Sequence, residues 1–158
     1  MESNYLGQAL NKLHEKVGQT VSKSHWFEVT QDHVDQYAEV SRDHQWIHVD
    51  PVRAKKESPY GDAIAHGNLT LALIGHLPEV DGYGMPELEG KKLGINYGFN
   101  RIRFPAPVPV GSFIRCKGLL KSAEIKGGMI ETVTEITVEV KGNQKPACVA
   151  EKVGRIVF

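Results

Sequence analysis

The sequence GMIETVTEITVEVK, residues 128–141, alternates between two faces with a period of two residues. One face is mostly apolar and the other mostly charged. The first set is Ile130, Thr132, Thr134, Ile136, Val138 and Val140, and the second is Glu131, Val133, Glu135, Thr137 and Glu139. This period is that of a β-strand with one face on a core and one in water, which is typical of antiparallel sheets.

Three further segments of strand character accompany this one. They are Leu93–Phe104, Ser112–Ser122 and Pro146–Val157, and clusters of Pro or Gly separate them. Gly127 and Gly128 are a tight-hairpin signal between two of these strands. The second half of the chain is therefore predicted to be an antiparallel meander of about four strands.

The first half of the chain predicts helices and one strand. Apolar residues at helical spacing in Leu6–Val17 indicate an amphipathic helix, so residues 1–18 are expected to form a helical extension. A two-sided strand pattern follows at residues 21–29. Thr30 has the character of a helix N-cap, and the helix after it is expected to run to about Val40.

Residues 63–77, AIAHGNLTLALIGHL, are apolar almost all round. Such a helix is buried on every side, so we expect it to be the central helix of the fold. A polar loop precedes it at residues 41–62, with a possible short helix at Val52–Ser58, and long loops in compact domains are often functional. The predicted fold is α+β, a single domain over residues 1–158 in which an antiparallel sheet wraps around a long central helix.

Composition limits the possible classes of function. The 158 residues fit one domain, and 41% hydrophobic with 24% charged residues argue against a disordered or membrane protein. Nineteen basic and nineteen acidic residues cancel, so neither nucleic acid nor a membrane surface is an expected partner. No signal peptide is visible, which favours a cytoplasmic location. Cys116 and Cys148 lack CxxC spacing, so we expect buried free thiols and no metal site.

The polar loop holds a carboxylate and an imidazole five residues apart, Asp43 and His48, within SRDHQWIHVDP. A folded loop can aim both at one water, with Asp as a base at neutral pH and His as either partner. Each also has a structural interpretation: a turn or cap for Asp43, and a half-buried strand histidine satisfied by a backbone carbonyl for His48. The neighbouring His44 and Asp50 are expected to be solvated.

A second cluster, IAHGNLT at residues 64–70, lies at the predicted mouth of the buried helix. First-turn N–H groups lack intrahelical acceptors, so they can bind a carbonyl that gains negative charge. Gly67 would let a substrate approach the backbone closely, although tight packing of the helix start also explains a glycine. For His66 a capping or core role is favoured over catalysis, because a backbone donor needs no imidazole.

Taken together, these segments resemble the MaoC-like family of hot-dog-fold hydratases and dehydratases, particularly the R-specific enoyl-CoA hydratases and the branch that includes nodulation protein N. The family pattern is a helix ending in Ser/Gly-x-Asp, four residues and then His, followed later by Ala-His-Gly at the start of the hot-dog helix. Here it reads Ser41-Arg42-Asp43, His48 and Ala65-His66-Gly67. The segment RIRFPAPV at residues 101–108, with Gly111, also resembles the family.

The resemblance implies that Asp43 and His48 hydrogen-bond one water, which attacks C3 of a trans-2-enoyl thioester and yields the R-3-hydroxyacyl thioester. Gly67 N–H, with His66 beside it, would bind the thioester oxygen. The implied substrate carrier is coenzyme A, with no separate cofactor, and a homodimer with edge-to-edge sheets is implied as well. Candidates for the coenzyme A phosphates are Lys55, Lys56, Arg101 and Arg103, each of which is otherwise a solvated charge or a structural ion pair.

Asn68 departs from the family pattern, because a hydrophobic residue is expected after His-Gly. Its side chain is predicted to narrow or rewire the acyl entrance. Two other functions stay open. The first is a hot-dog thioesterase, which the lack of a carboxylate on the buried helix disfavours, and the second is a non-catalytic acyl-CoA-binding protein, which the presence of Asp43 and His48 disfavours.

Overall fold

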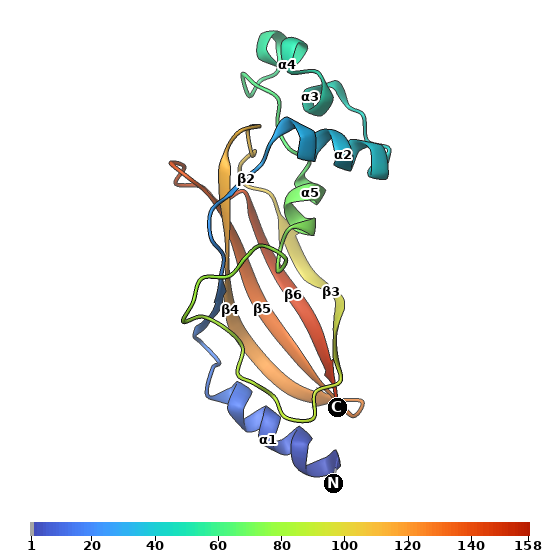
Figure 1. Ribbon diagram of the computed structural model, residues 1–158, viewed down its shortest axis with the longest axis vertical. Helices are drawn as coiled ribbons and strands as arrows, with labels where there is room; N and C mark the ends of the chain where they lie inside the picture. Colours follow the sequence, from blue (N-terminus) through green and yellow to red (C-terminus); the bar gives the residue numbers. More distant parts are fainter. Residues whose placement is uncertain (1) are drawn as a thin grey trace.

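A computed structural model of the protein describes residues 2–158, with side chains from residue 5 onward (Figure 1). The helices are α1 (Glu2–His14), α2 (Gln31–Ser41), α3 (Trp46–Val49), α4 (Pro51–Glu57) and α5 (Gly67–Ala72). The strands are β1 (Thr20–Lys23), β2 (Phe27–Glu28), β3 (Leu93–Arg103), β4 (Phe113–Lys126), β5 (Met129–Val140) and β6 (Cys148–Val157). None of the helices in residues 2–158 is long and apolar enough to cross a membrane.

The strands form one antiparallel sheet with the order β1-β4-β5-β6-β3, and β2 also pairs with β4. The predicted meander is confirmed, because β4, β5 and β6 follow one another both in the chain and in the sheet. Gly127 and Gly128 join β4 to β5 with φ angles of 60° and 76°, a backbone that suits a two-residue hairpin and favours glycine. The sheet curves around one side, where α5 lies (Figure 1).

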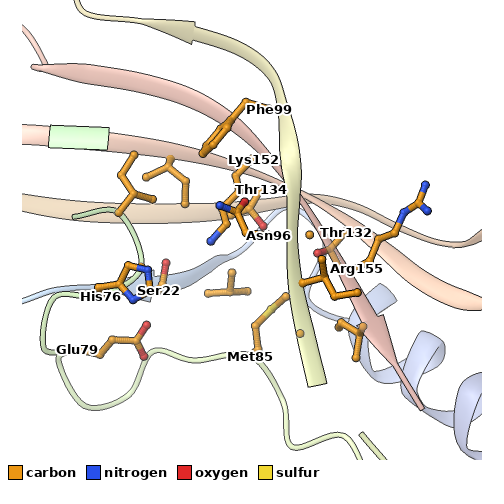
Figure 2. Close-up of a pocket in the computed structure, with 18 of the residues that line it drawn as sticks. Ser22, His76, Glu79, Met85, Asn96, Phe99, Thr132, Thr134, Lys152 and Arg155 are labelled. Carbon is orange, nitrogen blue, oxygen red and sulfur yellow. The ribbon is translucent and has the colours of Figure 1, made fainter. Parts of the chain in front are cut away.

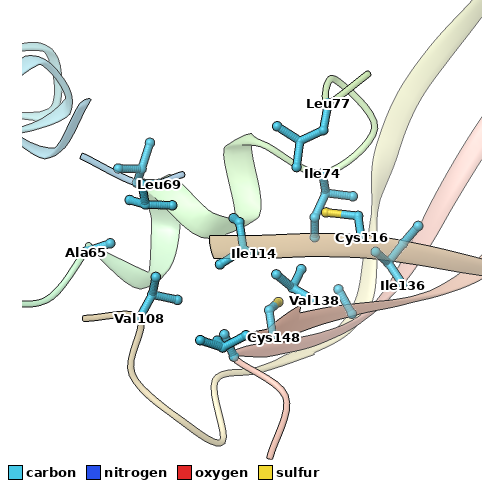
Figure 3. Packing of buried hydrophobic residues seen from close by; sticks show 14 of the residues in the cluster. Ala65, Leu69, Ile74, Leu77, Val108, Ile114, Cys116, Ile136, Val138 and Cys148 are labelled. Carbon is cyan, nitrogen blue, oxygen red and sulfur yellow. The ribbon is translucent and has the colours of Figure 1, made fainter. Parts of the chain in front are cut away.

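The concave face of the sheet carries two hydrophobic cores. The α5 core joins Leu69 of α5 to strand residues such as Ile114, Ile136 and Val138, and Figure 3 shows these side chains facing one another. The α1 core lies toward the other end of the strands and consists of Ala9, Leu13, Val21, Leu88, Leu120, Ala123, Ile130 and Ile156. The N-terminal extension is therefore part of the packing, because α1 supplies two buried side chains, Ala9 and Leu13, to this second core.

The α+β hot-dog arrangement is confirmed, but the long central helix is wrong. Only Gly67–Ala72 is α-helical within the predicted 63–77 segment. Its first residues are extended instead, because Ala65 N–H donates to the Val108 carbonyl and the Ala63 carbonyl accepts from Val110. The far end is broken at Gly75, whose φ of 79° lies in the left-handed region.

The first predicted strand is divided into two. Thr20–Lys23 and Phe27–Glu28 both pair with β4, and His25 N–H between them donates to the carbonyl of Pro78 outside the sheet. The opening helix also ends earlier than predicted, at His14, and turns carry the chain to Gly18.

The polar loop is more ordered than the sequence suggests. The possible helix at Val52–Ser58 is confirmed as α4, which begins at Pro51 and receives an N-cap bond from Arg53 N–H to Asp50 Oδ1 of 2.9 Å. The short helix α3 was not predicted. Thr30 is confirmed as the N-cap of α2, where its side chain accepts from His33 N–H. These three helices stack beyond α5 at one end of the sheet (Figure 1).

Candidate active site

Asp43, His48 and His66 meet beside the start of α5. One ligand atom from each residue lies within 4.8 Å of the others. Asp43 follows the end of α2, His48 lies on α3, and His66 is the N-cap of α5. The carboxylate is exposed, whereas His48 and His66 are 7% and 3% exposed. The arrangement therefore sets one solvated acid beside two enclosed imidazoles.

A sharp helix end positions Asp43. Arg42 takes a left-handed conformation with φ of 65°, which stops α2. Asp43 N–H then donates to Ser41 Oγ at 3.3 Å, and Asp43 Oδ1 accepts from Gln45 N–H at 3.3 Å. The turn interpretation of Asp43 is thus confirmed. It does not oppose a chemical role, because one carboxylate oxygen is enough to hold the turn.

A backbone carbonyl sets the tautomer of His48. Its Nδ1–H donates to the Ile64 carbonyl at 2.6 Å, so Nε2 carries the free lone pair when the ring is neutral. Burial lowers the pKa of His48 below its ordinary value, and the neighbouring His66 adds to this effect, while the bond to Ile64 and the charge of Asp43 oppose it. A neutral imidazole with Nε2 as acceptor is the form required of a base near pH 7.

His66 connects the two other residues. Its Nε2–H donates to the backbone carbonyl of Asp43 at 2.9 Å, and its ring stacks on that of His48 with centroids 3.8 Å apart. The ring of Tyr37 covers another side at 5.0 Å. The capping position and burial predicted for His66 are confirmed, although its Nδ1 has no partner among the described residues. Its contacts are those of a support for Asp43 and His48.

Gly67 is the first residue of α5, and its N–H belongs to the first turn, where intrahelical acceptors are lacking. A Cβ at this position would lie 3.2 Å from three ring atoms of Phe104. The packing explanation for this glycine is therefore supported, because Phe104 occupies the space beside its Cα. The role of Gly67 N–H toward a substrate stays a prediction.

Two imidazoles and a carboxylate at this spacing are also a donor set of the kind that binds transition metals. In each ring one nitrogen already donates to a backbone carbonyl, that of Ile64 for His48 and that of Asp43 for His66. Only one nitrogen per ring is left for any further bond. The expectation that the protein needs no metal stays a prediction.

A cavity of about 750 Å³ lies between the α5 segment, β3 and the concave face of the sheet, and Asp43, His48 and His66 are not part of its lining. Asn68, directly after Gly67, lies in its lining, so the predicted effect of this residue on an acyl entrance has a structural setting. Leu71, Ile74, Phe99 and Ile136 line an apolar part. Figure 2 shows a polar part, with Thr132, Thr134 and Lys152 on the sheet and His76 and Glu79 on the opposite loop.

The four cations predicted to bind coenzyme A form two pairs on separate elements. Lys55 and Lys56 are exposed in the last turn of α4. Arg101 and Arg103 are exposed on β3 and line a smaller cavity of about 330 Å³ together with Glu135 and Glu151. Arg103 donates to its neighbouring carbonyl at Ile102. Their role as phosphate ligands stays a prediction.

The remaining residues of the loop have structural roles. His44 pairs with Glu39 at 2.8 Å on the surface, as expected for a solvated neighbour, and Asp50 caps α4. A backbone carbonyl was one predicted partner of His48, and the hydrogen bond to Ile64 confirms it, but the residue is buried on α3 and does not lie half-buried on a strand. That the carbonyl is the one of Ile64, and that the Phe104 ring lies against Gly67, was not predicted. Neither has a sequence signal, because any residue supplies a carbonyl and an aromatic residue at a strand end has many uses.

The chain resembles proteins of known family over most of its length. The family model described as the MaoC like domain matches residues 12–143. The 3-hydroxyacyl-thioester dehydratase Z of Mycobacterium tuberculosis is 48% identical over 89% of this chain and 90% of that protein. Nodulation protein N of Rhizobium leguminosarum is 40% identical over 90% and 88%. A crystal structure of a MaoC-like dehydratase from Rhodospirillum rubrum shares the fold, with a TM-score of 0.69 and 19% identity over 90% and 92% of the two chains.

Proposed function

The chain belongs to the MaoC-like family, and on that premise we propose that it is a hydratase/dehydratase that interconverts trans-2-enoyl-CoA and (R)-3-hydroxyacyl-CoA. The observation that carries the proposal is the meeting of Asp43, His48 and His66 within 4.8 Å, with the His48 tautomer set by Ile64. A related protein bears the name of a 3-hydroxyacyl-thioester dehydratase, the same reaction in reverse.

In hydration, Asp43 and Nε2 of His48 hold one water between them. As the water oxygen bonds to C3, its proton passes to the acid-base pair, and the electrons of the C2=C3 double bond move toward the thioester. The thioester oxygen gains negative charge, which the N–H of Gly67 stabilises. The proton then returns to C2, so water is added and nothing else is consumed. Because attack and protonation use one side of a fixed site, a single enantiomer results.

The experiment replaces each member of the acid-base pair by its nearest neutral analogue, Asp43→Asn and His48→Gln. Each variant is expected to lose at least about 100-fold in kcat for crotonyl-CoA, since general acid-base catalysis contributes about 10² to 10⁴. The assay follows the loss of enoyl ultraviolet absorbance, and circular dichroism checks the fold.

Matched controls are Asp50→Asn and His44→Gln, which change the same residue types in the same segment but contact α4 and Glu39. Both are expected to keep nearly normal rates. Near-normal hydration by Asp43→Asn or His48→Gln would reject the assignment. Release of free thiol from an acyl-CoA would instead indicate a thioesterase, although α5 itself carries no carboxylate.

Coenzyme A as carrier is part of the proposal. Exposed Lys55 and Lys56 at the end of α4, and Arg101 with Arg103 on β3, are cations accessible to phosphate groups from solvent. Arg binds phosphate by two parallel hydrogen bonds, whereas Lys acts as a point charge. Substitution of either pair by alanine is expected to raise KM more than it lowers kcat.

We also propose a homodimer formed at β3. This strand is at the edge of the sheet and exposes Leu93, Ile95 and Tyr97, with exposures of 49%, 40% and 57%. A long apolar edge strand pairs readily with another strand, and a second copy supplies the identical edge. A cytoplasmic location completes the proposal, and the two buried free thiols agree with a reducing compartment.

A further inference from the structure

The concave face of the sheet carries a polar band between its two hydrophobic cores. Two neighbouring rows of residues cross β5, β6 and β3 in the strand register. The first row is Thr134, Lys152 and Phe99, and the second is Thr132, Gly154 and Asn96. Along β5 and β6, the inward-facing pair that follows Thr134 and Lys152 is Ile136 with Ala150, which belongs to the α5 core. The next pair on the other side, Ile130 and Ile156, belongs to the α1 core.

Such a band is unusual, because the inner face of a half-covered antiparallel sheet is normally apolar. Lys152 is only partly exposed, yet no carboxylate of the described residues lies within ion-pair distance of its ammonium. Its Nζ lies 3.5 Å from the place a Cβ of Gly75 would take, so the side chain reaches across the cavity toward the segment after α5. Among the described side chains this cation therefore has no counter-ion.

The other charged side chains of the cavity lining do not supply one, because Arg155 and Lys91 are cations themselves and no ion pair joins Glu79 to Lys152. Arg155 is engaged, because its guanidinium binds Glu131 at 3.0 Å and lies over the ring of Tyr97. Glu79 and His76 are exposed on the opposite loop, as Figure 2 shows, with Lys152 pointing into the space between the sheet and that loop. The hydroxyl of Thr134, next to Lys152, is available to the same cavity.

The cavity extends from this band to Asn68, although Asp43, His48 and His66 are not part of its lining. Asn68 in its lining is adjacent to Gly67, whose N–H is the proposed partner of the thioester oxygen. Leu71, Ile74 and Ile136 line the part near α5, and the band lies beyond them. An acyl chain that leaves the thioester in this direction first meets apolar side chains and then the ammonium of Lys152.

We propose that this site takes an acyl chain bearing a carboxylate remote from the thioester, with Lys152 as the counter-ion and Thr134 as a hydrogen-bond donor to it. The inference rests on the proposed function, because it assigns the cavity to the acyl arm of a 2-enoyl thioester. The substrate class is therefore the coenzyme A monothioester of an unsaturated dicarboxylic acid, and a plain alkyl chain leaves Lys152 unpaired.

The test compares two substrates of equal chain length, a trans-2-enoyl-CoA that ends in a methyl group and one that ends in a carboxylate. The variant is Lys152→Met, which keeps an unbranched side chain of nearly the same length and removes its charge. The control is Lys121→Met, at an exposed lysine of β4 outside the cavity. The wild-type protein and the control are expected to favour the carboxylate substrate.

In Lys152→Met the ratio of kcat/KM between the carboxylate and methyl substrates is expected to fall about tenfold or more, the usual size of a charge-assisted bond. Thr134→Val should lower the same ratio by a smaller factor. An unchanged ratio in Lys152→Met, or a wild-type preference for the methyl substrate at every chain length, would overturn the inference while leaving the hydratase function in place.

Lys152 could instead bind a phosphate group of coenzyme A, and two parts of the experiment distinguish this from binding of the acyl carboxylate. If Lys152 bound a phosphate, Lys152→Met would lower both substrates equally, and the loss would disappear with pantetheine thioesters. Calorimetric binding of a saturated carboxyacyl-CoA gives a readout without turnover. Weaker binding of about tenfold in Lys152→Met is expected even if the protein hydrates neither enoyl substrate, and equal binding would again overturn the inference.

Discussion

Substitution of His66 by phenylalanine isolates the support that this residue provides to the acid-base pair. Phenylalanine fills a similar volume and can retain the stacking on His48, whose centroid lies 3.8 Å away. It removes the 2.9 Å bond from Nε2–H to the carbonyl of Asp43. It also removes the buried Nδ1, which has no partner among the described residues. The change thus releases the main chain of Asp43 while keeping the packing.

The structure predicts a small effect of this substitution on stability and a larger effect on catalysis. The lost hydrogen bond destabilises the protein by about 1 kcal/mol, and removal of a buried unpartnered nitrogen offsets part of this. The melting temperature should therefore fall by no more than about 4 °C. Catalysis should suffer more, because misplacement of a reacting group by about 1 Å costs about 100-fold. We expect kcat to fall about tenfold to 100-fold, with a small change in KM.

The assay measures crotonyl-CoA hydration at saturating substrate, together with thermal unfolding. His14→Phe is the matched control, since His14 Nε2 makes a bond of the same length, 2.9 Å, to the carbonyl of Ala123 near α1. This control should lose stability alone. A normal kcat in His66→Phe, with an inactive Asp43→Asn, would refute the positioning role of His66.

Three further predictions concern other parts of the molecule. Burial lowers the pKa of His48 from 6.5, so the hydration rate should fall in acid only below about pH 6.5. As the pH decreases, the unfolded chain binds a proton at His48 at a higher pH than the folded protein does, so the free energy of unfolding should decrease as the pH is lowered below about 6.5. His48→Gln should lack this contribution to the pH dependence. Gly67→Ala should lower kcat/KM because its Cβ meets Phe104 at 3.2 Å, and adding Phe104→Ala should recover part of the loss, as double-mutant kinetics would show. Ile95→Lys on β3 should halve the mass measured by light scattering, whereas Ile125→Lys, at a similarly exposed isoleucine, should leave it unchanged; equal masses for all three proteins would contradict dimerisation at β3.

Local patterns in the sequence were sufficient for the strands of the second half. The alternation in residues 128–141 gives the correct inner face, because a period of two leaves only one assignment when one side is covered. Helix starts were also predictable where a side chain caps them, as at Thr30. The length of a helix was not predictable from these local patterns. The apolar run at 63–77 predicts a long helix, but main-chain bonds from Ala63 and Ala65 to residues 108–110 replace its first turn.

The residue types of the candidate site and their order could be predicted from the sequence, since Asp43, His48 and the Ala-His-Gly segment follow a pattern that resembles that of the MaoC-like family. The three-dimensional contacts were needed to find that His66 bridges the other two and that Ile64 sets the tautomer of His48. They also show that Lys152 faces a cavity with no counter-ion among the described side chains. The difference lies in the sequence separation over which each kind of interaction acts. Periodicity and capping act over a few neighbouring residues, whereas these contacts join residues 16 to 23 positions apart, or place a cation among groups from separate strands.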